Sequence, residues 1–268
     1  CDMGASPNDF TGYQKIANED VVKKFEDAWG TELPHWQGLR STEVFPAAIA
    51  GDVRGLFIFG EDPVRTDPDT HHVIRALESL EFLVVSELFM TETAKYADVV
   101  LPGAAYAEKE GTFTNTERRI QRVRKAVGAP GQARLDTDIF IDIMNRMGYA
   151  QPQLTGAQIM DEIAQLTPSY HGVSHERLDG ADVAGRGLQW PCLAGDHPGT
   201  PIMHVDTFAR GRGTYSTAEY RPSAELPDGE FPLVMMTGRV LNQYNACAMT
   251  GRTPGLNEIC DESFIELN

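Results

Sequence analysis

The chain contains 268 residues, 41% of them hydrophobic, which is enough to bury a sizeable core in one large domain or two ordinary ones. Its formal net charge of −16 argues against general binding to nucleic acids or anionic membranes, because such partners need a basic surface. No apolar run approaches the ~20 residues of a membrane span, so no direct membrane insertion is expected, and the four scattered cysteines form no CxxC pair that would indicate a zinc site.

The first part of the chain predicts an irregular opening, rich in Gly, Pro, Asn and Asp, followed by two helices. Val22, Phe25 and Trp29 recur at helical spacing, so a helix is expected over residues 19–29. A second helix is expected around residues 42–50.

The middle of the chain alternates between apolar runs and helical segments. Continuous apolar runs at 56–59 and 82–85 are typical of strands that are buried on both faces, and a third strand is expected over the DVVL sequence at 98–101. A helix is expected between the first two, with Asp67 as its N-cap, Pro68 as its first residue and an end near residue 80. A short helical turn at Thr91-Glu92 separates the second pair of strands. This order predicts an α/β fold with a Rossmann-like parallel sheet and crossover helices.

Two further helices are expected after the predicted sheet. Asp136 is a candidate N-cap for a helix that would place Ile139, Ile143 and Met147 on one buried face. The other helix is expected over residues 157–166.

The composition changes again near residue 168. Residues 168–229 are rich in Gly, Pro, His and Asp and are expected to form a wrapping segment, because ordered loops of that length are otherwise uncommon. The sequence FPLVMMTGR at 231–239 predicts a strand that begins a second domain. The expected domains are therefore 1–229 and 230–268. Because the chain opens on Cys1, we expect it to be a piece of a longer polypeptide.

Polar residues follow each predicted strand of the sheet. Ligands of open parallel sheets bind beyond the carboxyl ends of the strands, and a carboxylate there can accept paired N–H groups such as those of guanine. No GxGxxG or phosphate-binding loop occurs, so ordinary pyrophosphate binding is not indicated. Each carboxylate can also be a helix cap or a solvated loop residue. The residues at these strand ends are Gly60, Glu61, Asp62, Pro63 and Thr66, then Ser86 and Glu87, then Gly103.

Two other motifs have both a functional and an ordinary interpretation. Five basic residues lie within 118–125, but no aromatic residue separates them, which favours a solvated strand or helix face over a nucleic-acid site. The Thr-Gly-Arg sequence at 237–239 can bind an anion or a pterin-like heterocycle, or it can be an ordinary turn. His171 and His175 are expected to be loop histidines, because no third metal ligand has suitable spacing.

Several strings occur together in an order that resembles one enzyme family. They are CDMGASPNDFTGYQ, GEDPVRTDPD, ADVVLP, EGTFTNTERR, GLQWPC, DHPGTP and TGRVLNQYNACAMTGR. Together they resemble the catalytic subunit of molybdenum- or tungsten-dependent formate dehydrogenases, within the molybdopterin oxidoreductases. The resemblance covers essentially the whole chain, and the GLQWPC and DHPGTP strings point to the formate dehydrogenase branch.

This resemblance implies an activity and a set of cofactors. In the family, a metal held by two molybdopterin guanine dinucleotides (bis-MGD) oxidises formate to carbon dioxide. Electrons leave through a 4Fe-4S cluster to iron–sulfur subunits or to partners linked to NAD(P)H, quinone or ferredoxin. A cytoplasmic location is expected, with a periplasmic one left open. Residues from 230 onward are expected to begin a C-terminal β-barrel domain.

The resemblance also implies which residues bind the cofactor. No catalytic residue and no metal ligand is expected in this chain, because the family's metal ligands precede the CDMG string, so the fragment alone should be inactive. Ser86-Glu87 stands where many relatives have Gln-Asp, and Gly103 where they often have Ser or Ala. The residues expected to bind the cofactor are Gly60, Glu61, Asp62, Pro63, Thr66, Ser86, Glu87, Gly103, Asp138 of the Thr137-Asp138 pair, Gly238, Arg239, Gln243, Tyr244 and Asn245.

Two alternatives stay open at this point. Another molybdopterin oxidoreductase, such as a nitrate reductase or the related subunit of a respiratory NADH dehydrogenase, would share most of these strings. A cofactor carrier or assembly scaffold without catalysis would share the cofactor-binding residues alone.

Overall fold

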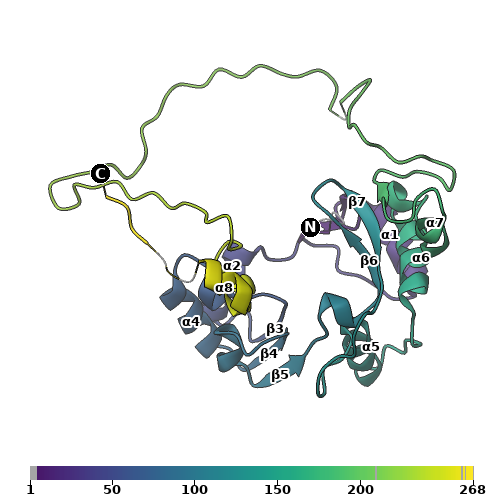
Figure 1. Cartoon of the computed structure of the whole chain (residues 1–268), viewed down its shortest axis with the longest axis horizontal. Coiled ribbons are helices and arrows are strands. Elements are labelled where there is room, and N and C mark those ends of the chain that lie inside the picture. Colours follow the sequence, from purple (N-terminus) through teal and green to yellow (C-terminus); the bar gives the residue numbers. More distant parts are fainter. Residues whose placement is uncertain (1–4, 209, 261, 263, 268) are drawn as a thin grey trace. The chain divides into compact units, whose positions relative to one another are not determined.

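The computed structural model describes residues 5–208, 210–260, 262 and 264–267 (Figure 1). The chain divides into two compact units, one formed by residues up to 64 together with 69–201, and the other by 65–68 together with residues from 202 onward. Residues 1–4, which form the CDMG string, lie outside the described residues. Each unit is described by itself.

The first unit begins with a small hairpin and two helices. Strands β1 (Asp9–Phe10) and β2 (Gln14–Lys15) pair antiparallel. Helix α1 (Glu19–Trp29) starts where the Asn18 side chain accepts a hydrogen bond from the backbone of Asp20, and it ends at Gly30 in the left-handed conformation. Helix α2 spans Ser41–Ala50. Both helices match the sequence prediction closely.

A parallel three-stranded sheet follows, in the order β3–β4–β5, which confirms the predicted fold class. Helix α2 packs against α4, and Figure 1 shows β4 and β5 side by side. Ten buried residues from the strands and helices form the core under this sheet, including Ile58, Val73, Leu83 and Val85. The elements are β3 (Gly55–Phe59), α3 (Pro63–Thr66), α4 (Thr70–Glu78), β4 (Phe82–Glu87), the 3-10 turn η1 (Thr93–Tyr96) and β5 (Val99–Pro102).

The helix expected to open at Asp67-Pro68 begins two residues later. Asp69, not Asp67, is the N-cap of α4, and its carboxylate accepts a hydrogen bond from the backbone N–H of His72 at 2.9 Å. Pro68 lies between α3 and α4, where it belongs to neither helix. The prediction was wrong because two aspartates flank the proline and only one of them satisfies the free N–H groups of the helix.

Helix α5 (Asp136–Arg146) also begins differently from the prediction. Its N-cap is Leu135, which makes no side-chain cap, and Asp136 is the first helical residue. Met147, expected on the buried face, is 82% exposed, whereas Ile139 and Ile141 are buried. Helix α5 therefore buries more than one narrow stripe, which an i, i+4 pattern does not predict.

The first unit also contains an antiparallel sheet, in the order β6–β7–β8. Its strands are β6 (Gly111–Thr114), β7 (Arg119–Val123) and β8 (Leu188–Gln189), and the 3-10 turn η2 (Tyr106–Glu108) precedes them. Helix α6 (Gly156–Leu166) opens with a capping box between Thr155 and Gln158, close to the predicted start.

The segment after α6 contributes much of the second core. It contains η3 (Pro168–Tyr170) and α7 (His175–Asp179). The buried side chains of Ile120, Met160, Tyr170, Val173 and Cys192 belong to one cluster beneath β7. Residues 168–201 are therefore packed into the first unit, although they contain little regular structure.

In the second unit, the described residues from 202 onward contain two short elements, η4 (Thr250–Arg252) and α8 (Pro254–Ile259). The strand expected at 231–239 is not formed, and Met235 and Met236 are each 87% exposed. A strand needs a neighbour for its backbone hydrogen bonds, and none of the described residues pairs with this segment. Among the described residues, no helix has the length and apolar character to span a membrane.

Candidate functional site

The carboxyl ends of the three parallel strands meet at one edge, as the sequence predicts. Phe59 pairs with Ser86, and Glu87 pairs with Pro102. Beyond the last paired residues, the Gly60 N–H donates to the Ser86 carbonyl at 3.0 Å and the Gly103 N–H donates to the Glu87 carbonyl at 3.1 Å. These bonds bring Gly60, Ser86 and Gly103 to the same edge of the sheet, which we call the strand edge.

Asp62 lies just beyond the strand edge and is only 3% exposed. Its Oδ1 accepts hydrogen bonds from the backbone N–H of Thr93 at 2.9 Å and from the Thr93 hydroxyl at 2.7 Å. Its Oδ2 is buried and has no hydrogen-bond partner among the described residues. One half of the carboxylate therefore holds the loop to η1, and the other half is free to accept a hydrogen bond from a bound group.

Ser86 and Gly103 provide a second acceptor and the space beside it. The Ser86 hydroxyl is buried and also lacks a partner in the described part of the chain. A Cβ atom added to Gly103 would lie 3.2 Å from Asp136 Oδ1 and 3.8 Å from Ser86 Oγ. Asp136 and Ser86 therefore both lie beside Gly103, and a side chain at that position would crowd the aspartate.

Asp136 is a site residue that the sequence interpretation missed. Its Oδ2 forms an ion pair with the Lys109 ammonium group, and the two side chains are 20% and 26% exposed. A backbone bridge between Gly103 and Arg134 holds the start of α5 against the end of β5. The sequence could not reveal this neighbour, because Asp136 at the start of a helix is equally consistent with an ordinary cap.

The other predicted residues of the first unit have different surroundings. The Asp138 carboxylate accepts a hydrogen bond from Gln153 Nε2 at 2.6 Å, on the exposed surface of α5. Glu87 is buried, and its Oε1 accepts a hydrogen bond from the N–H of Leu88 at 2.7 Å. Glu61 and Thr66 are exposed, and Pro63 is buried at the start of α3.

The predicted residues of the second unit form a hydrogen-bonded loop of their own. Gln243 Nε2 donates to the Cys260 carbonyl at 2.9 Å and to Asn257 at 3.2 Å, whereas its Oε1 is buried without a partner in the described chain. The Tyr244 N–H donates to the Thr250 hydroxyl at 3.0 Å, and its ring is exposed. Arg239 Nε lies 3.5 Å from the Asn245 side-chain oxygen. Gly238 has open space around its Cα.

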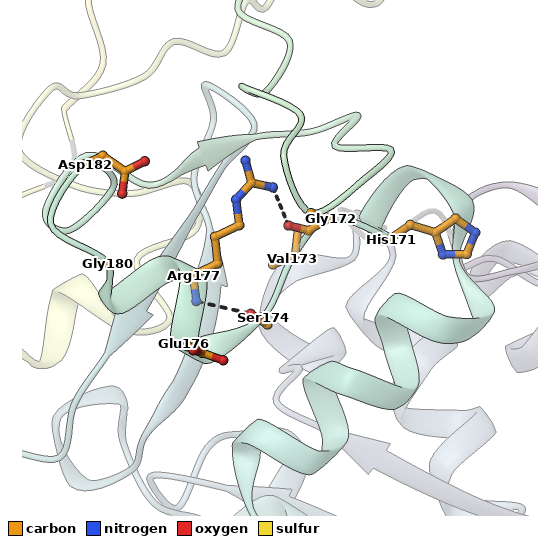
Figure 2. A pocket seen from close by; sticks show the side chains of 9 residues that line it. His171, Gly172, Val173, Ser174, Glu176, Arg177, Gly180 and Asp182 are labelled. Carbon is orange, nitrogen blue, oxygen red and sulfur yellow. Dashed lines mark hydrogen bonds between the residues drawn. The ribbon is translucent and has the colours of Figure 1, made fainter.

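A separate pocket lies around α7, and its walls are structural. It has a volume of about 390 Å³ and is lined by residues that include His171, Ser174 and Arg177 (Figure 2). Arg177 Nη1 donates to the Gly172 carbonyl at 2.6 Å, and its two terminal nitrogens together contact three carbonyls and the Cys192 thiol. Ser174 caps α7. These polar groups hold loops together, so this pocket is a weaker candidate than the strand edge.

The arginine-rich strand β7 also serves the structure. Arg118 donates to backbone carbonyls of Trp190 and Thr200 and lies over the Trp190 ring. Arg122, with a side chain only 10% exposed, donates to the Gly111 carbonyl at 2.9 Å and pairs with Asp179. The sequence left open whether a strand or a helix carries these residues, and the structure forms strand β7. The expectation that the basic residues are only a solvated face was wrong for Arg118 and Arg122.

His175 also differs from its prediction. It is the first residue of α7 and is buried, not a loop histidine. Among the described residues, no three His, Cys, Asp or Glu side chains gather as a metal site would require.

Comparisons with known proteins show which family the chain belongs to. The family model for molybdopterin oxidoreductases matches residues 3–146, which include all three parallel strands. The F420-dependent formate dehydrogenase subunit alpha of Methanocaldococcus jannaschii is 46% identical over the whole of this chain. The F420-dependent formate dehydrogenase 2 subunit alpha of Methanococcus maripaludis is 47% identical, again over the whole chain.

The chain covers 39% of the length of each of these two relatives. Among solved structures, acetylene hydratase from Pelobacter acetylenicus is similar to 58% of the chain, at 20% identity and a TM-score of 0.44, and the match covers 22% of that protein. A likeness of that size carries no argument. The match of the family model to more than half of the residues, together with the parallel sheet and its polar edge, shows that the chain belongs to the molybdopterin oxidoreductase family.

Proposed function

We propose that this chain anchors the guanine end of a molybdopterin guanine dinucleotide, as part of a formate dehydrogenase catalytic subunit. The observation that carries the proposal is the pair of buried acceptors at the strand edge, Asp62 Oδ2 and Ser86 Oγ, neither of which has a hydrogen-bond partner in the described chain. Buried polar atoms are rarely left unpaired, and a nearby group that donates N–H bonds would satisfy them.

The donor set fits guanine in particular. The Watson–Crick edge of guanine presents a ring N–H and an amino group, which are donors, and carboxylates are the acceptors that bind such paired donors most strongly. Asp136 Oδ1 adds a third acceptor beside Gly103. We therefore propose Asp62, Ser86 and Asp136 as the residues that bind guanine, with the remaining predicted residues of the first unit around them.

When bound, the cofactor supplies the metal that carries out the redox step, and the protein orients it. The proposal includes bis-MGD with molybdenum or tungsten, a 4Fe-4S cluster elsewhere in the polypeptide, and Gly238, Arg239, Gln243, Tyr244 and Asn245 as contacts of the second unit. Residues 1–229 are proposed as the α/β cofactor domain, and residues 230–268 as the start of a β-barrel domain.

The substrate is proposed from the relatives. Both archaeal relatives are named formate dehydrogenase subunits and match the chain over its whole length. Formate is therefore the substrate proposed for the intact enzyme, and coenzyme F420 is the electron acceptor to test first, ahead of iron–sulfur, NAD(P)H, quinone or ferredoxin-linked partners. We propose a cytoplasmic enzyme.

The full-length subunit provides the first test. Purified with its cofactor, it should reduce a viologen dye when formate is added, and it should not oxidise reduced viologen when nitrate is added. Nitrate reduction without formate oxidation would favour the nitrate reductase alternative. A protein that holds the cofactor but oxidises neither donor would favour a carrier or scaffold.

Asp62→Asn tests the anchoring role directly. Asparagine keeps one oxygen for Thr93 but replaces the free oxygen by an N–H₂ donor, which cannot accept a bond from guanine. We expect cofactor binding to weaken by about 1–3 kcal/mol, the range for a hydrogen bond to a charged group. The measurement is the guanine nucleotide released per polypeptide after acid hydrolysis. Asp52→Asn, at an exposed loop position, is the control, and unchanged cofactor content in Asp62→Asn would refute the assignment.

A further inference from the structure

Lys109, the partner of Asp136, lies next to the strand edge. It follows η2 directly, and its ammonium group pairs with Asp136 Oδ2, 27 residues further along the chain. Both side chains are mostly buried, with exposed fractions of 26% and 20%. An ion pair in this environment is held more firmly than a surface pair, because neither charge can easily return to water.

The ion pair determines which oxygen of Asp136 faces the strand edge. Lys109 engages Oδ2, while Oδ1 lies 3.2 Å from the position of a Cβ on Gly103. The hydrogen bond of the Asp136 side chain within the described part of the chain is made through Oδ2, which leaves Oδ1 available. The buried Ser86 hydroxyl, also without a partner there, lies beside the same glycine. Two acceptors therefore face one position, and Lys109 holds one of them in place.

Without Lys109, Asp136 would have a competing conformation. It lies in the first turn of α5, where four backbone N–H groups lack helical partners, and the N-cap residue Leu135 offers no side chain to satisfy them. A free carboxylate in the first turn is attracted to those N–H groups and to the helix dipole. Arg134, the nearest arginine in the chain, donates to Asp142 and to the Asp138 carbonyl instead. Lys109 is thus the cation that keeps Asp136 turned away from its own helix.

We propose that Lys109 is a positioning residue for recognition of the purine: it binds Asp136 Oδ2 so that Oδ1 stays available to an N–H donor of guanine. This inference rests on the proposed function, since it concerns how the same site selects its ligand. Lys109 itself is not expected to touch the cofactor.

The test uses the full-length subunit purified with its cofactor. In Lys109→Met, the guanine nucleotide retained per polypeptide after gel filtration should fall by about tenfold, the effect of losing one hydrogen bond to a charged group. Lys109→Arg should restore retention, because arginine keeps the cation. Asp136→Asn should match Lys109→Met, and the double variant should lose no more than either single variant, since both changes remove one interaction. Lys95→Met, which breaks an exposed pair with Glu92, is the control.

The outcomes separate this inference from the proposed function. Loss of cofactor in Asp136→Asn with full retention in Lys109→Met would overturn the positioning role and leave the guanine site standing. Full retention in Asp62→Asn and Asp136→Asn together would overturn both. If Lys109→Met lowered retention only by destabilising the fold, its melting temperature would fall. Lys109→Arg would then show the same fall and no rescue, and this result would also contradict the proposal.

Discussion

Arg122 in β7 and Arg124 just after its end bind the same carboxylate, Asp179, yet they differ in burial. Arg122 lies 3.2 Å from Asp179 with 10% of its side chain exposed, and it also donates to the Gly111 carbonyl. Arg124 lies 2.5 Å from the same oxygen with 62% of its side chain exposed. Burial, not charge, should therefore decide what each residue contributes.

We expect Arg122→Met to lower the free energy of unfolding of the first unit by about 1–3 kcal/mol, because it leaves the partly buried Gly111 carbonyl without its donor and removes the more buried of the two cations beside Asp179. Arg124→Met, the matched control, should cost about 0–1 kcal/mol, as exposed pairs do. Urea denaturation followed by circular dichroism measures both. Equal losses in the two variants would show that the pairing with Asp179 alone matters and that burial of Arg122 does not.

His175 should make the protein sensitive to mild acid. Burial, followed by the neighbouring Arg122 guanidinium, lowers the pKa of His175 below its ordinary value, although Asp179, Glu110 and Asp161 oppose this effect. The unfolded chain therefore binds a proton at a higher pH than the folded chain. Stability from this group is complete above about pH 6.5 and is lost as the pH falls through the lowered pKa.

To test this, the free energy of unfolding is measured at about pH 7.5 and about pH 5.5, on either side of the ordinary histidine pKa. His175→Gln should show a smaller loss between the two than the unmodified chain does. His72→Gln, on α4, is the control, because His72 is not one of the charged groups that act on His175. An unchanged pH dependence in His175→Gln would assign the acid sensitivity to carboxylates.

At the strand edge, Asp62 and Ser86 could be named as candidates from the sequence because each comes shortly after an apolar run, and parallel strands bring their carboxyl ends together. It missed Asp136 because that residue joins the edge through a bridge between Gly103 and Arg134, which no local pattern encodes. It also could not assign half of the Asp62 carboxylate to Thr93, since that contact spans 31 residues.

Helices were predictable where apolar residues recur at helical spacing directly after an N-cap residue. Helix α1 has Asn18 as its cap and buries Val22 and Phe25, so its bounds follow from the sequence. Helix α4 was displaced because two aspartates compete for the role of cap, and the choice depends on which one reaches a free N–H. Strands β6 and β7 are half-buried and have few apolar residues, so their pairing depends on contacts that the apolar pattern does not show.

The segment at 231–239 shows that strand propensity alone does not make a strand. Its residues favour strands, yet Met235 and Met236 are almost fully exposed, because a strand forms only when a neighbouring strand accepts its hydrogen bonds. The composition of the segment therefore indicates only that it can pair with another strand, and the described residues supply no neighbouring strand.

Across the whole molecule, the two units differ greatly in how much apolar surface they bury. The first unit contains both clusters of buried hydrophobic residues, around Val85 and around Ile120. In the described residues of the second unit, no hydrophobic side chain is buried, and Leu233 and Tyr215 are among its exposed ones. Stability should therefore be concentrated in the first unit.

Hydrogen exchange measured by mass spectrometry should show this difference. We expect amides in β3, β4 and β5 to exchange orders of magnitude more slowly than those at 212–240, because slow exchange requires hydrogen bonds protected by packing. Peptides from α8 serve as an internal comparison, since this helix belongs to the second unit but has its own hydrogen bonds. Strong protection at 231–239 would show that this segment forms the strand that its sequence favours.

Helix α5 carries an aromatic contact and a polar contact one turn apart. Phe140 packs against Phe57 and Phe59, with ring centroids 5.7 and 5.2 Å apart, on the sheet face opposite the first core, and Asp136 lies one turn earlier on the same helix. Because Phe140 and Asp136 belong to one helix, we expect the size of these three rings to influence where Asp136 lies beside Gly103. Exchanges among aromatic residues that lie away from the strand edge should therefore shift a carboxylate at that edge.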